Sequence, residues 1–180
     1  MQSPNISDLI TECRKHNETA FRKLVEMHQG MVFTFSFRML CNDDDAKDAV
    51  QETFYRVWTN MHKYRPEMKF STWLFSIASN LCCDKLRSRK RRQNVSNIES
   101  IHFDVLADDL ENTVTNSDLA KIIHVLTDKL TPKQKLIFTL RDLEGLEVEE
   151  VEKITSITAA KIKSNLYLAR QFIREKLEKM

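Results

Sequence analysis

The sequence predicts an all-α protein of two small helical domains joined by a flexible acidic linker. Its 180 residues include only two glycines and three prolines. Because sheets and hairpins need turn residues at short intervals, this scarcity favours long helices with short connections. Apolar residues also recur at three- and four-residue spacing along most of the chain, which is the period of a buried helix face. A chain of this length can form one domain or two, and a polar stretch near its middle favours two.

The first predicted helix begins after Asn17, whose side chain can cap it, and continues to about Leu40. Its apolar stripe consists of Phe21, Leu24, Val25, Val32, Phe35 and Met39, widened by Phe33 and Phe37. A stripe this wide needs apolar partners on more than one side. We therefore expect this helix to be the centre of an N-terminal bundle and its aromatic residues to belong to the core.

The second predicted helix has an apolar and a polar face. Asp43, Asp44 and Asp45 offer a cap and negative charge at its positive end. The apolar face consists of Ala46, Ala49, Val50, Phe54, Val57, Trp58 and Met61. The polar face consists of Asp48, Gln51, Glu52 and Tyr55. Taken alone, this polar face has the pattern of an ordinary solvated surface.

A third helix follows a predicted loop at residues 64–69, where Pro66 disfavours helix at Arg65. Its apolar face consists of Phe70, Trp73, Leu74, Ile77, Ala78 and Leu81, and its opposite face of Thr72, Ser76, Ser79 and Asn80. Six cations then lie between Lys85 and Arg92. Loop aromatics beside small polar groups and a basic run can stack unpaired bases while holding phosphates. The alternative is a packed helix with a solvated basic end.

Residues 93–116 are predicted to be the linker, because they lack periodicity and are rich in Asn, Ser, Thr and Asp. No Lys or Arg occurs from Gln93 to Ala120, so the net charge of +2 hides a separation of the two signs along the chain. The acidic residues of this stretch are Glu99, Asp104, Asp108, Asp109, Glu111 and Asp118. A linker of about twenty residues lets two domains sit apart. We hypothesise that its acidity mimics nucleic acid and suppresses unproductive binding.

Residues 117–180 are predicted to form the C-terminal domain. Its first helix has an apolar face of Leu119, Ile122, Ile123, Leu126 and Leu130. Thr131 and Gln134 then form a capping box with Pro132 at the first helical position, which is a specific helix-start signal. The buried side of this second helix consists of Leu136, Ile137, Leu140 and Leu143. Gly145 is the expected C′ residue that ends it.

The end of the chain has the pattern of a helix-turn-helix. A short helix with Val148, Val151 and Ile154 leads to a tight turn at residues 155–157, and Thr158 is the predicted cap of the last helix. That helix is expected to bury Ile162, Leu166, Ala169, Ile173 and Leu177. Its outer face consists of Lys161, Lys163, Ser164, Asn165, Tyr167, Arg170 and Arg174. These side chains combine phosphate ligands with groups that can read base edges, and the alternative is a helical bundle with a solvated face.

No pattern of catalytic or metal-binding residues is visible. The four cysteines, Cys13, Cys41, Cys82 and Cys83, lack metal-ligand spacing and favour a reducing, cytoplasmic location. The five histidines are dispersed, and no Ser/His/Asp set or glycine-rich phosphate loop occurs. Neither a signal peptide nor a stretch approaching the roughly 18 apolar residues of a membrane span is present. We therefore expect no cofactor, no metal site, no catalytic residue and no membrane insertion.

Three blocks, in this order along the chain, resemble the bacterial sigma-70 family, and specifically its small extracytoplasmic-function (ECF) type. DAKDAVQETFYRVW resembles the segment by which these factors grip the clamp of core RNA polymerase. KFSTWLFSIASNLCCDKLRSRKRR resembles the part that melts and reads the −10 promoter element. LTPKQKLIFTLRDLEGLEVEEVEKI followed by TAAKIKSNLYLARQFIREKL resembles the domain that binds the −35 element. The resemblance covers nearly the whole chain outside the N-terminus and the linker.

The resemblance implies a promoter-specificity subunit, not an enzyme, that initiates transcription with core RNA polymerase. Residues 1–92 would form the domain that binds the polymerase clamp and the −10 element, and residues 117–180 the domain that binds the −35 element. Its partners would be the clamp and flap of the polymerase and promoter DNA, both as duplex and as melted single strand. An anti-sigma factor is a further partner that the resemblance suggests.

The resemblance also implies a role for individual residues. The polymerase contacts would be Asp48, Gln51, Glu52 and Tyr55. The −10 contacts would be Lys63, Tyr64, Arg65, Lys69, Phe70, Trp73, Asn80, Arg87, Arg89 and Arg91. A flipped base would enter the loop at residues 64–70, above Asn80, and stack on groups such as Tyr64 or Phe70. The −35 contacts would be Thr158, Lys161, Lys163, Ser164, Asn165, Tyr167 and Arg170.

The chain departs from the family pattern in its helix-turn-helix. Glu152 stands where the family usually has alanine, and Ser156 where the turn usually has glycine. Asn165 and Leu168 replace arginines that are common in the recognition helix. These changes remove positive charge and place a carboxylate near a tight helix crossing, so they bear on −35 recognition.

Two other classes of function remain to be compared with this one. A stand-alone helix-turn-helix regulator would bind duplex DNA without the polymerase, and it leaves the aromatic loop and the Asp48 face unexplained. A nucleic-acid hydrolase would need clustered carboxylates for metal ions. The acidic residues here lie in the predicted linker or on a solvated face, which disfavours the hydrolase.

Overall fold

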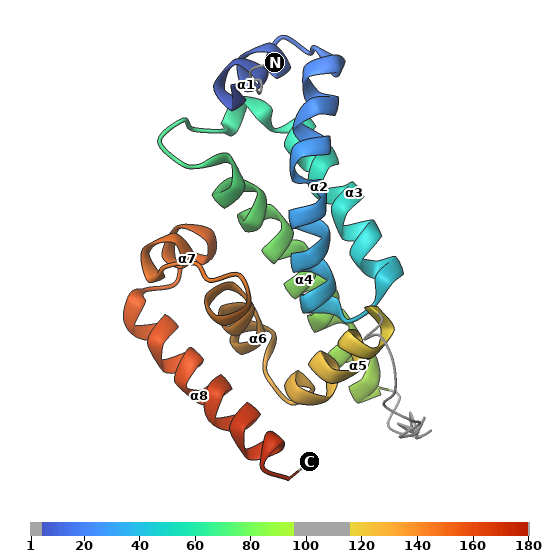
Figure 1. Cartoon of the computed structure of the whole chain (residues 1–180), viewed down its shortest axis with the longest axis vertical. Coiled ribbons are helices and arrows are strands. Elements are labelled where there is room, and N and C mark those ends of the chain that lie inside the picture. Colours follow the sequence, from blue (N-terminus) through green and yellow to red (C-terminus); the bar gives the residue numbers. More distant parts are fainter. Residues whose placement is uncertain (1–4, 96–115, 180) are drawn as a thin grey trace.

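The computed structural model describes residues 5–95 and 116–179, and all regular structure within them is helical (Figure 1). The elements are α1 (Ile6–Cys13), α2 (Glu18–Leu40), α3 (Asp43–Thr59), η1 (Met61–Lys63), α4 (Phe70–Val95), α5 (Asn116–Thr127), α6 (Pro132–Phe138), η2 (Thr139–Leu143), α7 (Val148–Thr155) and α8 (Ala159–Leu177). The predicted all-α class is confirmed. Most of the predicted linker, residues 96–115, lies outside the described residues, and so does the hypothesis about its acidity.

The N-terminal part is a bundle in which α2 packs against α1, α3 and α4 (Figure 1). Asn17 caps α2 as predicted, because its side chain accepts a hydrogen bond from the Ala20 N–H. The cap of α3 differs from the prediction. Asn42, not an aspartate, accepts the hydrogen bond from the Asp45 N–H, and the three aspartates occupy the first turn, where they still complement the helix dipole.

Helix α1 was not predicted, although its sequence carries a signal. The Asn5 side chain caps it through the Ser7 N–H, and Leu9, Ile10 and Cys13 are buried on one face. This helix has only eight residues, too few to be stable alone. It forms because its apolar face packs against α2.

Helix α4 is packed on two sides, which the sequence pattern did not show. It contacts α2 and α3 in the N-terminal bundle and α6 and α7 in the C-terminal part. Thr72 and Ser79, expected on an open polar face, are consequently buried. Its C-terminal end continues to Val95 and so includes the start of the predicted linker.

The C-terminal part follows the predicted order of helices. The capping box of Thr131 and Gln134 is present, with Pro132 in the first turn of α6. A single π-helical turn, η2, continues α6, and Gly145 then adopts a left-handed φ of 68°, as expected of a C′ residue. Leu177 is a correction, because it lies in the last turn of α8 and is exposed.

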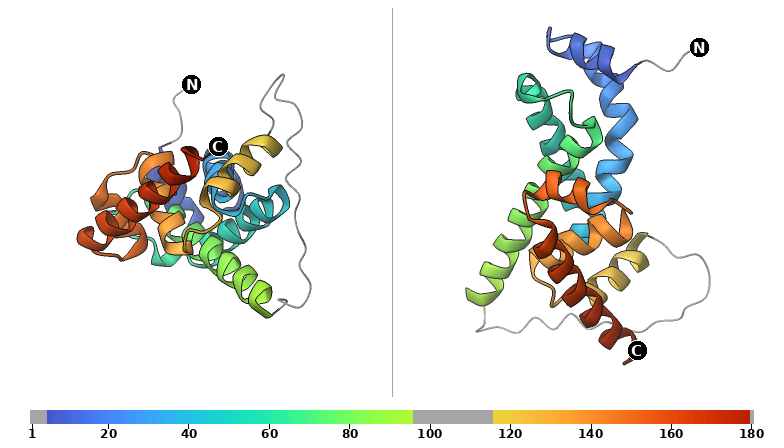
Figure 2. Two further views of the ribbon diagram at one scale, coloured as in Figure 1. Left: turned by 90° about the horizontal axis from the view of Figure 1, so that it is seen from below. Right: turned by 90° about the vertical axis from the view of Figure 1, so that its left-hand side faces the viewer.

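The two parts share one apolar core. Buried residues of α2 and α4 are continuous with Ile137, Leu140, Val151 and Ile162 of the C-terminal part, and a smaller cluster forms around Leu130, Ala169 and Ile173. Helices α6 and α7 lie between α4 and α8 (Figure 1), and Figure 2 shows this packing from two other sides. A linker of the predicted length would let the two parts sit apart, but in this structure they pack against each other. The domain boundaries at 92 and 117 stay a prediction.

Candidate nucleic-acid interface

The four residues of the polar face of α3 come together on the surface. Asp48, Gln51, Glu52 and Tyr55 line one shallow depression, which Lys85 of α4 completes. We call these five residues the α3 face. Lys85 Nζ lies 3.4 Å from Asp48 and 2.9 Å from Asp45, so this lysine ties α4 to α3. Glu52 pairs with Arg56 one turn further along α3, at 2.7 Å.

The basic end of α4 is held to the bundle through Asp45. Arg89 donates hydrogen bonds to the Asp45 carboxylate and, at 2.8 Å, to the Leu40 carbonyl. Burial alone would raise the pKa of Asp45, but hydrogen bonds from Lys85 and Arg89 outweigh it and lower that pKa below its usual range. Arg89 was predicted to contact DNA. In this conformation its guanidinium instead binds Asp45 and the Leu40 carbonyl within the protein.

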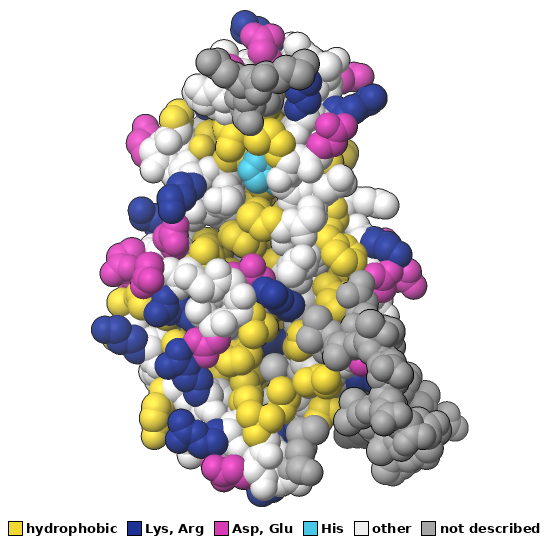
Figure 3. All heavy atoms as spheres, viewed as in Figure 1, with side chains coloured by type: hydrophobic (Ala, Val, Ile, Leu, Met, Phe, Trp, Pro, Cys, Tyr) yellow, Lys and Arg dark blue, Asp and Glu magenta, His cyan; other side chains and the backbone are white. Residues whose placement is uncertain are grey.

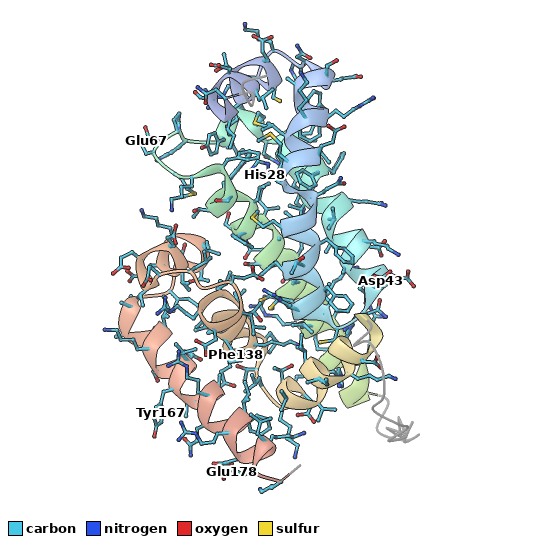
Figure 4. The ribbon with its side chains drawn as sticks, viewed as in Figure 1. His28, Asp43, Glu67, Phe138, Tyr167 and Glu178 are labelled. Atoms are coloured by element: carbon cyan, nitrogen blue, oxygen red, sulfur yellow. The ribbon has the colours of Figure 1, made fainter. Side chains whose placement is uncertain are left out.

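The aromatic residues of the loop at 64–69 support the loop from within. Tyr64 and Phe70 are only 7% and 4% exposed. Tyr64 packs against Phe70 and Trp73 with ring centroids 5.6 and 5.3 Å apart, and His28 of α2 packs edge-on against Phe70. In Figure 4 the labelled His28 lies beside this end of α4, whereas Glu67 marks the outer tip of the loop.

The expectation that Tyr64 or Phe70 offers a free ring face to a base is therefore corrected for this conformation. Burial of large rings is favourable, and the Tyr64 hydroxyl also donates to the Met68 carbonyl at 2.6 Å. Arg14, the residue that follows α1, further fixes the segment by donating to the Tyr64 carbonyl at 2.6 Å. Of the three predicted aromatic contacts, only Trp73 is partly exposed.

A pocket of about 200 Å³ lies beside this loop. Its lining residues are Arg56, Asn60, Lys63, Trp73, Ile77 and Asn80. Lys63, Trp73 and Asn80 were predicted site residues, and the structure brings them together. Arg56, Asn60 and Ile77 were missed, because the last turn of α3 meets α4 only in the tertiary structure. An indole face, two amides and two cations are suited to hold an unpaired base and its phosphate.

The remaining predicted −10 cations differ in their surroundings. Arg65 and Arg91 are exposed, and Arg87 pairs with Asp84 at 2.9 Å. Lys69 pairs with Glu150 of α7 at 2.7 Å, across the two parts of the chain. The lysine side chain is 75% exposed, so solvent screens this pair and it adds little stability.

Helices α7 and α8 form the predicted helix-turn-helix, with Ser156 in the left-handed region at φ 55°. Lys161, Lys163, Ser164 and Tyr167 are exposed on α8, and so is Thr158 just before it. Figure 3 shows Lys and Arg side chains gathered over this side of the molecule, with acidic ones between them, and in Figure 4 Tyr167 points away from the protein. This face could meet a duplex without rearrangement of α8.

Two residues of the predicted −35 set are engaged within the protein. Asn165 is partly buried and donates to the Lys161 carbonyl at 2.7 Å. Arg170 forms two hydrogen bonds with the Asp142 carboxylate, at 2.8 and 2.6 Å. This bidentate pair occupies the guanidinium edge that arginine commonly uses to bind guanine.

Glu152 of α7 caps the N-terminus of α8. Its carboxylate accepts a hydrogen bond of 2.6 Å from the Ala159 N–H at the first turn of α8. Thr158, the predicted cap, makes no side-chain hydrogen bond to the helix. The carboxylate at the helix crossing is thus a cap supplied by the preceding helix, and it also suits the positive end of the α8 dipole.

Glu152→Ala is therefore expected to lower the free energy of unfolding by about 0.5–2 kcal/mol, the usual cost of a lost cap. Urea unfolding followed by circular dichroism measures this. Glu149→Ala, which removes an exposed carboxylate from the same helix, serves as the control and should change stability by less than about 0.5 kcal/mol. Equal effects of the two variants would contradict the capping role.

The described residues contain no metal site, no disulfide and no membrane-spanning helix. Within residues 5–95 and 116–179, no three His, Cys, Asp or Glu side chains are grouped as a metal site. The four cysteines are not paired with one another, and burial raises the pKa of the Cys82 thiol to about 12, which keeps it protonated. No helix in the described part of the chain is long and apolar enough to cross a membrane.

Both the family models and the curated relatives that match this chain are sigma-70 regions or sigma factors. Residues 24–92 match the Sigma-70 region 2 family, and residues 120–173 match the Sigma-70, region 4 family. The chain is 28% identical over 180 residues to the ECF RNA polymerase sigma factor SigW of Bacillus subtilis, and the match covers 96% of each chain. It is 29% identical over 178 residues to the ECF RNA polymerase sigma-E factor of Haemophilus influenzae, covering 94% of each.

Two solved structures share the fold. The sigma factor RpoE of Bartonella quintana, solved with the anti-sigma factor NepR, superposes with a TM-score of 0.67 at 22% identity, covering 88% of this chain and 96% of that one. CnrH, solved with the cytosolic domain of CnrY, superposes with a TM-score of 0.68 at 19% identity, covering 95% and 96%. Both likenesses extend over the N-terminal and C-terminal parts together.

Proposed function

Since the chain belongs to the sigma-70 family, as an RNA polymerase sigma factor of the ECF type, we propose that three of its surfaces divide the work of promoter recognition. A sigma factor is the promoter-specificity subunit of RNA polymerase, and it binds the core enzyme and promoter DNA. The observation that carries the assignment of surfaces is the α3 face, whose predicted residues lie together in one exposed depression.

The α3 face is the proposed contact with the polymerase clamp. Asp48 is 69% exposed, and Tyr55 is exposed one helical turn beyond Glu52. A solvent-facing aromatic ring beside carboxylates is suited to a protein interface, since aromatic anchors surrounded by charge complementarity dominate binding energy. Lys85 fixes the orientation of Asp48 from the neighbouring helix.

The pocket beside the loop at 64–69 is the proposed −10 site. Flipping a base out of the DNA stack costs a few kcal/mol, and stacking on an aromatic ring returns about 1–3 kcal/mol per base. Trp73 is the ring that lines the pocket, and the amides of Asn60 and Asn80 would bind polar edges of the base. Lys63 lines the same pocket, Arg65 is exposed two residues further along the chain, and both would bind the flanking phosphates.

The exposed face of α8 is the proposed −35 contact. Lys161, Lys163 and Ser164 are free to bind phosphates and base edges, whereas Arg170 is held by Asp142. Leu168 is 47% exposed where the family commonly has arginine. We expect weak duplex binding by this domain alone, because Arg170 is paired with Asp142 and Asn165 and Leu168 carry no charge.

Asn165→Arg together with Leu168→Arg is expected to tighten duplex binding and to steepen its salt dependence. Each new phosphate contact on B-DNA makes the slope of log K against log salt more negative by about 0.9, so two contacts would add almost 2. Fluorescence anisotropy with a promoter duplex at several salt concentrations measures both quantities. Gln29→Arg/Thr34→Arg on α2 adds the same charge elsewhere, and an equal gain in that control would show that α8 does not face DNA.

Catalysis is assigned to the polymerase, and the chain itself acts by binding and by stabilising melted DNA. This role places it in the cytoplasm with its polymerase. An anti-sigma factor is the proposed regulatory partner, because RpoE of B. quintana was solved with the anti-sigma factor NepR. A stand-alone helix-turn-helix regulator is the competing function.

Transcription in vitro tests the proposal. The chain and bacterial core RNA polymerase are incubated with a library of duplexes that differ at the −35 and −10 positions, and the RNA products are sequenced. Initiation at defined sequences only when both proteins are present is the expected result. Duplex binding without polymerase-dependent initiation would favour the stand-alone regulator.

A further inference from the structure

A cavity of about 160 Å³ lies where the two parts of the chain meet. It lies between the end of α2, the basic end of α4, α5, and the start of α6. The charged or titratable residues of its lining are Arg89, Lys90, His124, Asp128 and Lys135. Its volume is several times the roughly 30 Å³ that one water occupies in the liquid, so it can hold a small polyatomic ion.

Lys135 is the unusual member of this lining. It is only 6% exposed, and its ammonium makes a single hydrogen bond, to the Cys41 sulfur at 3.3 Å. A thiol is a weak acceptor, and an ammonium has three N–H donors. Among the described residues, no carboxylate lies within 4.0 Å of this ammonium. Buried charges are normally paired, so this ammonium is suited to bind an anion.

Among the described lining residues, the single carboxylate does not supply that anion. Asp128 pairs with Lys176 of α8 at 3.1 Å. Arg89 is occupied by Asp45, while Lys90 is exposed at the rim. His124 adds a further ring that can become cationic. Burial lowers the pKa of His124, and the nearby charge of Lys135 lowers it further, while Asp128 opposes both.

We propose that this cavity is a binding site for a small phosphate-bearing anion that bridges the two parts of the chain. Lys135 from α6, Lys90 from α4 and His124 from α5 would donate to its oxygens. Phosphate presents several strong acceptors to donors that converge from different helices, as charge-assisted hydrogen bonds require. Promoter DNA is a poor candidate for this ligand, because a duplex cannot enter a cavity of this size between packed helices.

Binding would link the relative placement of the two parts to the concentration of the ion. Three different helices contribute donors, and α4 belongs to the N-terminal part whereas α5 and α6 belong to the C-terminal part. An ion that binds this arrangement stabilises it by mass action. Lys135 and His124 belong to none of the proposed polymerase and DNA surfaces, whereas Arg89 of the lining was also predicted to contact the −10 element.

Titration of the full chain tests the site. Inorganic phosphate, pyrophosphate and AMP are each added at a constant ionic strength set with sodium chloride, and the thermal midpoint and the NMR signals of the His124 ring are followed. We expect saturable binding of at least one phosphate compound, a rise in midpoint and a rise in the pKa of His124, because a neighbouring anion favours its protonated form. Tighter binding of AMP than of inorganic phosphate identifies a nucleotide as the source of the phosphate group.

Lys135→Met is expected to weaken this binding about tenfold or more, since it removes a charged hydrogen-bond donor while conserving the shape of the stem. Lys90→Gln, an exposed substitution that leaves the core intact, is expected to weaken it several-fold. Lys129→Met removes an exposed cation outside the cavity lining and should bind like wild type. The proposal is overturned if sodium chloride alone reproduces the changes, or if neither cavity variant weakens binding relative to Lys129→Met.

Discussion

Asp48→Arg combined with Glu52→Arg is expected to abolish co-elution of the chain with core RNA polymerase on gel filtration. Both carboxylates belong to the exposed α3 face, one turn apart on the same helix. Truncating one member of a buried charge pair at a protein interface costs about 2–5 kcal/mol, which is roughly a 30-fold to several-thousand-fold loss of affinity. Reversal of two charges adds repulsion to that loss.

Two controls separate this effect from misfolding and from net charge. Glu18→Arg/Glu26→Arg makes the same charge change at exposed positions of α2 and should co-elute as wild type does. Asp48→Asn/Glu52→Gln removes the charges without repelling Lys85, and it should weaken binding less than the reversal. Co-elution of the reversed variant at wild-type levels would assign the polymerase contact to another surface.

Phe35→Ala is expected to lower the free energy of unfolding by about 3–5 kcal/mol, the usual cost of deleting a buried aromatic ring. Phe35 is fully buried on α2, and its ring meets Phe75 of α4 edge-on, with centroids 5.2 Å apart. The deletion therefore leaves a cavity and also removes an aromatic pair worth about 0.5–1.5 kcal/mol beyond its burial.

Urea unfolding followed by circular dichroism measures the loss. Tyr167→Ala is the matched control, because it also removes an aromatic ring but from a residue that is 69% exposed on α8. It should change stability by less than about 0.5 kcal/mol. A loss below about 1 kcal/mol for Phe35→Ala would mean that the contact between α2 and α4 is not part of the stable core.

The two alignments to family regions end close to the predicted domain limits, yet the apolar core does not divide there. Ile137 and Leu140 of the C-terminal part belong to the same cluster as Leu24 and Leu74. Burial of apolar surface stabilises whatever arrangement achieves it, at roughly 25 cal/mol per Å². Binding of polymerase or of an anti-sigma factor would therefore compete with this contact if either partner separates the two parts.

The sequence by itself determined the helical class and most helix ends, because these depend on interactions within a few residues. The caps at Asn17 and at Thr131, the end at Gly145 and the face of α3 all follow from local spacing. The shift of the α3 cap from the aspartates to Asn42 is a change of one position. Helix α1 was missed because a polar composition hid its short apolar face.

Only the tertiary structure decided which of the predicted side chains are exposed and available to bind a partner. Burial of Tyr64 and Phe70, the engagement of Arg89 and Arg170, and the capping of α8 by Glu152 each depend on residues distant in the sequence or on the packing of neighbouring helices. A charged or aromatic residue has the same local pattern whether it faces solvent or a neighbouring helix. The sequence therefore predicts which residues are candidates for each surface, and the packing of the helices determines which of these residues are exposed.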